Sequence, residues 1–252
     1  MLKIDHLTLH FEGLVATDDI CMEVEDHKVT ALIGPNGAGK TTIFNQIAGV
    51  YKPDEGKIYL DGEDITGLRP FEVCQKGITR TYQVIKLFSG MSVIDNVLVG
   101  MHTKLERNFW QDVFHSRSMR ESEKEAFKKA HELLELVGLD QYADHPAGSL
   151  AYGQQRLVEI ARALAPSPKL VLFDEPAAGM NLKEKNDLNE MIRRIIDMGT
   201  TVLLVEHDMS LVMNVADIIY VINSGQNLAK GSPKEISEDP AVIEAYLGRG
   251  EI

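Results

Sequence analysis

The segment Gly34–Thr41 constrains the fold more than any other feature of this sequence. It reads Gly-Pro-Asn-Gly-Ala-Gly-Lys-Thr, which fits the phosphate-binding pattern G-x-x-x-x-G-K-[ST]. The short apolar run Val29–Ile33 before it predicts a buried strand, and the apolar spacing of Thr42–Val50 after it predicts a helix. This order predicts an α/β fold built around a P-loop. A chance glycine-rich turn is the alternative, and the flanking elements make it the weaker interpretation.

The residue types of this loop suit the phosphates of a nucleotide. Glycines let the main chain wrap closely and direct N–H groups at phosphate oxygens, and the helix that follows adds the positive end of its dipole. We expect Lys40 to reach the β- and γ-phosphates and the Thr41 hydroxyl to bind Mg²⁺. The expected nucleotide-binding residues are Gly34, Pro35, Asn36, Gly37, Ala38, Gly39, Lys40, Thr41 and Thr42.

Two later strands are predicted to end in polar residues that suit the same chemistry. Leu170–Phe173 is followed by Asp174 and Glu175, and a second apolar run is followed by His207. Side chains at the carboxyl ends of parallel strands meet ligands beyond the sheet. We expect Asp174 to serve Mg²⁺, Glu175 to act as general base on the attacking water, and His207 to contact the γ-phosphate or that water. Taken alone, an acidic strand cap and a structural histidine are the alternatives, and the P-loop upstream disfavours both.

A stretch of small residues, Ser149–Arg156, precedes a helix predicted over Leu157–Ala165. An exposed main chain at the start of a helix is a possible second anion site. An ordinary helix start is the simpler interpretation of the stretch by itself. Together with a P-loop elsewhere in the chain, it indicates a nucleotide site shared between two subunits.

The remaining patterns outline a single domain with a helical insert. Strand and helix patterns alternate over 1–84 and again over 161–252, which predicts βαβ units and a parallel sheet, with antiparallel strands near the start. Helical periodicity dominates 85–160, including a long charged helix over Glu121–Val137. The polar, irregular residues at about 102–122 have the character of an insertion.

Composition excludes several classes of protein. The formal net charge is −12, which argues against nucleic acid as a main partner, because binding phosphate backbones needs a basic face. No apolar run approaches the length of about 18 residues needed to span a membrane, and the first residues lack a signal-peptide core, so we expect a cytoplasmic protein. Cys21 and Cys74 are expected to be buried, reduced thiols rather than a disulfide or a zinc site.

The order of these motifs resembles the ATPase subunit of ABC transporters over nearly the whole chain. The motifs that carry the resemblance are Walker A at Gly34–Thr42, the Q-loop glutamine Gln83, the signature at Leu150–Gln154, Walker B at Leu170–Glu175, the D-loop at Ala178–Asn181 and the switch histidine His207. Phe11 resembles the aromatic residue that stacks on adenine. The resemblance implies a single ABC ATPase domain with a RecA-like core, an antiparallel β part and a helical subdomain.

The resemblance also implies roles for individual residues. It assigns catalysis of ATP hydrolysis to Glu175, His207 and Lys40. It assigns Mg²⁺ binding to Thr41, Gln83 and Asp174. The ATP would be covered by Ala151, Tyr152, Gly153 and Gln154 of a second subunit. Further implied partners are transmembrane permease subunits, which would hold the chain at the inner face of the membrane, and indirectly a substrate-binding protein.

Two departures from the family pattern are visible. The signature is usually Leu-Ser-Gly-Gly-Gln, whereas here Ala151 and Tyr152 stand between Leu150 and Gly153. The usual serine hydroxyl is therefore missing, and main-chain N–H groups with the helix dipole remain, so we expect hydrolysis to survive in weakened form. The D-loop ends in Asn181 rather than aspartate.

These departures resemble one subgroup, the ATPases of branched-chain amino-acid importers, and within it the longer of two paralogues. Leu150–Arg156, the insertion, Glu206–Met209 and Ala245–Gly248 carry this resemblance. The alternatives are the ATPases of lipopolysaccharide export or of urea and amide uptake, a non-transport ABC protein of translation or DNA repair, and a regulatory nucleotide-binding module. The substrate, and the choice between a homodimer and a heterodimer, stay open at this stage.

Overall fold

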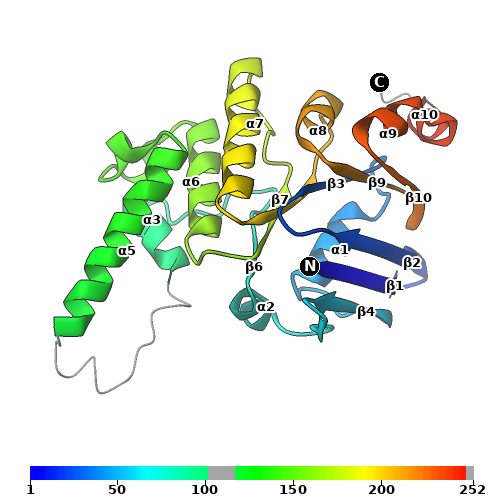
Figure 1. Cartoon of the computed structure of the whole chain (residues 1–252), viewed down its shortest axis with the longest axis horizontal. Coiled ribbons are helices and arrows are strands. Elements are labelled where there is room, and N and C mark those ends of the chain that lie inside the picture. Colours follow the sequence, from blue (N-terminus) through cyan, green and yellow to red (C-terminus); the bar gives the residue numbers. More distant parts are fainter. Residues whose placement is uncertain (102–116, 248–252) are drawn as a thin grey trace. The chain divides into compact units, whose positions relative to one another are not determined.

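The computed structural model describes residues 1–101 and 117–247. Its chain forms two compact units (Figure 1), one made of Met1–Arg80 with Lys169–Ile252 and the other of Thr81–Pro168. The first unit, which we call the core unit, contains both sheets. The second, the helical unit, is built from helices.

A six-stranded sheet forms the centre of the core unit, with strand order β10-β9-β3-β8-β7-β6. Its inner strands are parallel, and β10 pairs antiparallel with β9. Every residue of β3, β7 and β8 is buried, as their near-continuous apolar sequences require in a parallel sheet. The strands are β3 (Val29–Ile33), β6 (Ile78–Arg80), β7 (Leu170–Asp174), β8 (Thr201–Val205), β9 (Ile218–Asn223) and β10 (Gln226–Gly231).

The register of the three central strands brings the predicted polar residues to one edge. Leu32 of β3 pairs with Val205 of β8, and Val205 pairs with Asp174 of β7. The loop after β3, the carboxylates at the end of β7 and the polar residues after β8 therefore leave the sheet side by side. This edge is where an open α/β sheet binds ligands.

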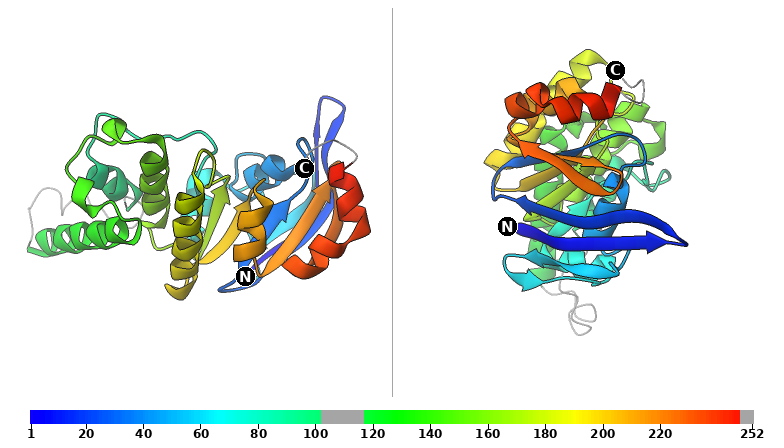
Figure 2. Two further views of the ribbon diagram at one scale, coloured as in Figure 1. Left: turned by 90° about the horizontal axis from the view of Figure 1, so that it is seen from above. Right: turned by 90° about the vertical axis from the view of Figure 1, so that its right-hand side faces the viewer.

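A second sheet of four antiparallel strands lies in the same unit, with order β2-β1-β4-β5 (Figure 2). Its strands are β1 (Leu2–Phe11), β2 (Leu14–Val24), β4 (Glu55–Leu60) and β5 (Glu63–Asp64). Apolar residues of this sheet, including Ile4 and Ile20, form one buried cluster with Phe44 of helix α1 (Lys40–Ile47) and Leu172 of β7. Burial of α1 in this cluster fixes the helix that carries Lys40.

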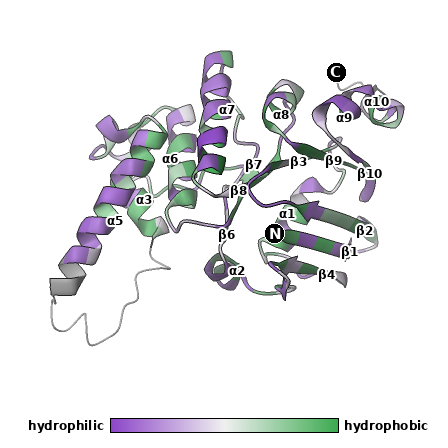
Figure 3. Cartoon of the chain, viewed as in Figure 1, coloured by the Kyte–Doolittle hydropathy of each residue, from purple (hydrophilic) through white to green (hydrophobic). Residues whose placement is uncertain are grey.

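The other helices of the core unit are α2 (Pro70–Lys76), α7 (Leu182–Asp197), α8 (Met209–Val215), α9 (Pro233–Glu238) and α10 (Pro240–Leu247). A second buried cluster joins β3 and β9 with α8, α9 and α10 through Ile33, Val212, Ile219, Ile236 and Val242. Hydrophobic residues mark these buried strands, whereas polar residues dominate α7 (Figure 3). Over the described residues, no helix combines the length and the apolar composition that crossing a membrane requires.

The helical unit contains α3 (Val93–Gly100), α5 (Arg117–Leu136), α6 (Tyr152–Leu164) and two 3₁₀ turns, Asp140–Tyr142 and Ala147–Ser149. The three helices contact one another, and Val97, Leu134 and Val158 among their residues are buried. Of the insertion predicted at about 102–122, residues 102–116 lie outside the described residues. The rest belongs to the start of α5.

The predicted fold class, with a P-loop, antiparallel strands and a helical part, is confirmed. The antiparallel strands form a sheet of their own rather than part of one mixed sheet. Helix α1 follows the P-loop as expected and begins at Lys40, after Gly39 as a left-handed cap. The helical spacing predicted up to Val50 was too long, because α1 ends at Ile47 and Val50 is exposed. The polar edge strand β10 and the three-residue β6 were not predicted.

The prediction that both cysteines are buried was wrong. Cys21 is exposed and Cys74 is partly buried. The strand β2 explains this, because Ile20, Met22 and Val24 alternate inward and leave Cys21 on the outer face.

Candidate functional site

The P-loop backbone needs glycine at two positions. Gly34 has φ 152°, and a Cβ added there would lie 2.0 Å from the carbonyl oxygen of Ile222. Gly39 has φ 105°, and its Cβ would lie 2.5 Å from the carbonyl oxygen of Ala16. A side chain at either place would collide with main chain from β9 or β2, so the close approach of these strands fixes the shape of the loop.

Lys40 lies inside this loop rather than on its surface. Its ammonium group donates to the carbonyl oxygens of Gly34 at 2.6 Å and of Pro35 at 2.9 Å, and the residue is 6% exposed. The adjacent Thr41 and Asn36 are exposed. The loop therefore holds one buried positive charge beneath an accessible rim, which is the arrangement that a phosphate chain requires.

Asp174 is held by a cation that the sequence analysis did not single out. Arg80, at the end of β6, donates from Nη2 to Asp174 Oδ2 at 2.8 Å, and the two side chains are 7% and 3% exposed. The same guanidinium donates from Nη1 to Asn45 Oδ1 of α1 at 2.6 Å. In the sequence, the only indication that Arg80 has a role at the site was its position just before Thr81-Tyr82-Gln83.

Glu175 and His207 meet directly. His207 Nε2 lies 3.1 Å from Glu175 Oε1, and their side chains are 42% and 20% exposed, respectively. Glu175 has a left-handed backbone, with φ 49°, and its N–H donates to the carbonyl oxygen of Val205 at 2.9 Å. Since non-glycine residues avoid this conformation, the neighbouring strand holds the catalytic candidate in a strained position.

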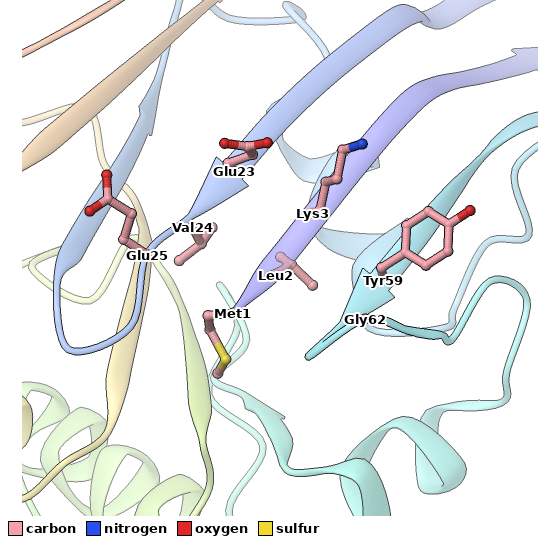
Figure 4. Close-up of a pocket in the computed structure, with 8 residues that line it drawn as sticks. All are labelled: Met1, Leu2, Lys3, Glu23, Val24, Glu25, Tyr59 and Gly62. Atoms are coloured by element: carbon pink, nitrogen blue, oxygen red, sulfur yellow. The ribbon is translucent and has the colours of Figure 1, made fainter.

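Two cavities differ in what lines them. One, of about 830 Å³, is lined at one end by Asn36 of the P-loop and by His207, and elsewhere by residues of α8, α9 and α10. The other, of about 470 Å³, lies at the ends of β1, β2 and β4 (Figure 4) and includes Lys3, Glu23 and Tyr59. Of these two, the first contains predicted site residues, Asn36 and His207, which therefore line one accessible space.

Phe11 lies at the end of β1 with an accessible ring. It is 40% exposed and packs edge-to-face on Tyr51, with ring centroids 5.2 Å apart. The same hairpin carries Ala16 against Gly39 of the P-loop. Phe11 thus offers a ring face on an element that also contacts the phosphate-binding loop, and Tyr51 supports it from the side.

The predicted residues of the helical unit are presented at a helix start. Helix α6 begins at Tyr152 rather than at the predicted Leu157. Ala151 precedes the helix without a side-chain cap, and Gln154 Oε1 accepts its N–H at 3.1 Å instead. Gly153 and Gln154 therefore belong to the first turn, and Ala151 and Tyr152 are exposed.

A buried ion pair lies in the same helix as these residues. Arg156 is fully buried and pairs with Glu159 at 2.9 Å. The guanidinium also donates to the carbonyl oxygen of Gln83 at 2.6 Å and to that of Tyr82. The exposed Gln83 is thus tied by its main chain to the helix that carries the signature stretch. The sequence analysis made no statement about the burial of either charged residue.

A separate trio of donor groups lies on the β1–β2 hairpin. His6, Asp19 and Cys21 place their ligand atoms within 4.8 Å of one another, and all three are exposed. The His6 ring is already hydrogen-bonded to Asp19 at 2.5 Å, and this contact raises the pKa of the histidine. None of the three belongs to the predicted nucleotide-binding set.

The core unit therefore brings together Gly34–Thr42, Asp174, Glu175 and His207 at one edge of the sheet, while Gln83 and the stretch from Ala151 to Gln154 belong to the helical unit. The arrangement provides a buried cation for phosphate, hard oxygen ligands for a divalent ion, and a carboxylate–imidazole pair for proton transfer. These are the parts needed for phosphoryl transfer to water.

Comparison with known proteins identifies the same family that the sequence motifs resemble. Residues 17–178 match the family model described as ABC transporter, and residues 226–252 match one described as branched-chain amino acid ATP-binding cassette transporter. The chain is similar to BraF of Pseudomonas aeruginosa, a high-affinity branched-chain amino acid transport ATP-binding protein, with 47% identity over 98% of both chains. It is 43% identical to LivG of Escherichia coli, again over 98% of both.

Solved structures agree with the sequence relatives. A nucleotide-free ATP-binding cassette from an ABC transporter superposes with a TM-score of 0.85 at 34% identity and 98% coverage of both chains. The ADP conformation of the cassette MJ1267 gives the same values. The fold is therefore shared with ATP-binding cassettes of ABC transporters.

Proposed function

This chain belongs to the ABC transporter family and is an ATPase, and on that premise we propose that it powers the import of branched-chain amino acids. One observation carries the choice of substrate. The chain is 47% identical over 98% of its length to a branched-chain amino acid transport ATP-binding protein, and a model specific to that group matches residues 226–252. Similarity over the whole length supports a shared role better than a shared motif does.

We assign the chemistry to the edge of the six-stranded sheet. The P-loop N–H groups and Lys40 bind the phosphates of ATP, and Phe11 stacks on the adenine. Glu175 accepts a proton from the attacking water, and His207, 3.1 Å from it, orients that water and the γ-phosphate. Because Lys40 is buried within the loop, its charge acts at short range on the transferred group.

The donor atoms at this edge fit Mg²⁺. Thr41 offers an exposed hydroxyl, and Asp174 a carboxylate, both hard oxygen ligands of the kind that Mg²⁺ prefers. We also assign Gln83 to this ion, from its resemblance to the Q-loop glutamine alone. When bound, the ion neutralises charge on the β- and γ-phosphates. The residues of this chain supply the rest: they bind the phosphate chain, orient the water and remove its proton.

We propose that two ATPase subunits enclose each nucleotide. ATP bound to Lys40 of one subunit is covered by Ala151, Tyr152, Gly153 and Gln154 of the other, where the first-turn N–H groups of α6 offer anion contacts. We divide the single ABC domain into a nucleotide core, 1–84 and 161–252, and a helical subdomain, 85–160. The helical subdomain docks on permease subunits, which hold the chain at the cytoplasmic face of the membrane and receive substrate from a binding protein.

Transport in a purified system tests this proposal. The chain is co-purified with its permease and second ATPase subunits, reconstituted in proteoliposomes, and supplied with the binding protein and ATP. We expect uptake of radiolabelled leucine, isoleucine or valine, and none with Lys40→Ala. Uptake of urea, an amide or another class of solute in place of these amino acids would contradict the assigned substrate.

A further inference from the structure

Glu206 is a buried carboxylate for which hydrolysis, as described above, has no use. It follows β8 directly and is 4% exposed. Its Oε1 accepts the N–H of Ala177 at 2.8 Å. Its Oε2 accepts the N–H of His207 at 3.1 Å and, more weakly, that of Asp208 at 3.5 Å. Burial raises the pKa of this carboxyl, while its main-chain hydrogen bonds oppose the shift. Burying an ionised carboxylate costs free energy, so the burial of Glu206 next to His207 requires an explanation.

The two shorter hydrogen bonds of Glu206 connect it to the two members of the proposed catalytic pair. Ala177 lies two residues after Glu175, in the turn that carries this glutamate away from β7, and His207 is the partner of Glu175 at 3.1 Å. One carboxylate therefore holds the main chain beside both groups. Glu175 itself has an unfavourable left-handed backbone, which must be held by contacts around it.

The loop beyond Ala177 extends this connection. The N–H of Met180 donates to the carbonyl oxygen of Ala177 at 3.1 Å, and Asn181 then caps helix α7 by accepting the N–H of Glu184. A displacement of the segment Ala178–Asn181 would therefore act on the N–H that Glu206 accepts. The same carboxylate would pass the displacement to His207.

We propose that Glu206 is a positioning residue that sets the distance between the Glu175 carboxylate and the His207 imidazole and links both to the loop Ala178–Asn181. This inference rests on the proposed hydrolytic site. A carboxylate suits the role because both of its oxygens accept, one from Ala177 and the other from His207 and Asp208. The amide of a glutamine has nearly the same shape and only one acceptor, so one N–H would face a donor.

The variant Glu206→Gln tests the role by steady-state hydrolysis and by binding of a fluorescent ATP analogue. We expect kcat to fall about 10- to 100-fold, because small displacements of reacting groups have effects of this size. KM and nucleotide affinity should change less than about twofold, since the P-loop is untouched. The control Glu72→Gln makes the same change at a remote glutamate that also accepts a main-chain N–H, from Arg69 at 2.8 Å, and should hydrolyse ATP normally.

A spectroscopic readout separates positioning from a general loss of structure. The His207 ring resonance, assigned by its disappearance in His207→Ala, should move in Glu206→Gln and stay in place in Glu72→Gln. If Glu206→Gln does not fold, Glu206→Asp, which keeps the charge and shortens its reach, takes its place with the same expectations.

A kcat within twofold of the wild-type value, or an unmoved His207 resonance, would overturn the proposal. Failure of the hydrolytic site itself would look different, because the wild-type chain and Lys40→Ala would then hydrolyse ATP at the same rate.

Discussion

Among the described residues, the core unit and the helical unit each contain a buried arginine–carboxylate pair, and we propose different roles for the two. In the core unit Arg80 pairs with Asp174 at 2.8 Å, and in the helical unit Arg156 pairs with Glu159 at 2.9 Å. Arg80 and Asp174 come from the ends of adjacent strands. Arg156 and Glu159 lie three residues apart on one helix, and the arginine also donates to the main-chain carbonyl groups of residues 82 and 83.

The difference lies in what can replace the arginine. Asp174 is the carboxylate that we assign to Mg²⁺, so a second cation can take over part of the work of Arg80. No second cation is assigned to Glu159. Burial raises the pKa of its carboxyl more than Arg156 and Arg162 lower it. We therefore propose that Arg80–Asp174 is an exchangeable pair that takes part in the chemistry, whereas Arg156–Glu159 is a permanent pair that stabilises the helical unit.

The largest effect is expected where the permanent pair is broken. Arg156→Met should lower the free energy of unfolding by about 3–5 kcal/mol, because it leaves a buried carboxylate without its partner. It also removes the donors that hold the main chain at Gln83. Urea unfolding followed by circular dichroism measures the change.

The double variant Arg156→Met with Glu159→Leu is the matched control. Replacing both members of a buried pair by apolar residues is often close to neutral, so more than half of the lost stability should return. A double variant as unstable as the single one would show that the carbonyl contacts, rather than the charge pair, hold the helical unit together.

The exchangeable pair should give a smaller loss that depends on the metal. Arg80→Met should cost about 3 kcal/mol without ligand, and Mg²⁺ with ATP should restore more stability to this variant than to the wild-type chain. Thermal unfolding with Mg²⁺ and ATP, and with ATP and a chelator, measures both. Arg156→Met should gain only as much from Mg²⁺ and ATP as the wild-type chain does. Equal gains in all three proteins would remove the distinction between the two pairs.

The smallest effect is expected for a partly buried ion pair near the site. Asp208 accepts the N–H of Leu211 at the start of α8 and pairs with Lys185 at 2.5 Å. Asp208→Ala should cost about 1 kcal/mol at pH 7, the usual value of a helix cap. The Lys185 contact lowers the pKa of Asp208 below its ordinary value. Its stabilisation is therefore fully present above the ordinary value and is lost as the pH falls through the lowered one.

Urea titrations at pH 7 and near pH 3 test the sign of this effect. The gap between the wild-type chain and Asp208→Ala should shrink at the lower pH. A gap that widened in acid would contradict the stated direction of the Asp208 shift.

Sequence reasoning located the phosphate loop and the strand ends because their patterns are local. An apolar run followed by Asp174 and Glu175 has few interpretations once Gly34–Thr41 stands upstream. The same reasoning could not find Arg80, since β6 has only three residues and its role depends on pairing with β7. It also placed the start of α6 at Leu157, because Ala151 lacks the usual capping side chain and Gln154 serves instead.

Burial was the harder property to predict. Arg156 and Glu159 have the charge and spacing of an exposed helical pair, yet both are at most 1% exposed, because partners distant in sequence cover them. Cys21 was assigned to the interior from its residue type, although the alternation of β2 places it outside. In both cases the outcome depended on which face of an element meets a neighbour.

The central claim is that Glu175, next to His207, removes the proton from the water that attacks ATP. Single-turnover hydrolysis by Glu175→Gln, measured together with nucleotide binding and size-exclusion chromatography, tests it most directly. The account predicts a rate at least about 100-fold below the wild-type value, with ATP still bound and an ATP-dependent dimer. Hydrolysis within twofold of the wild-type rate would contradict it.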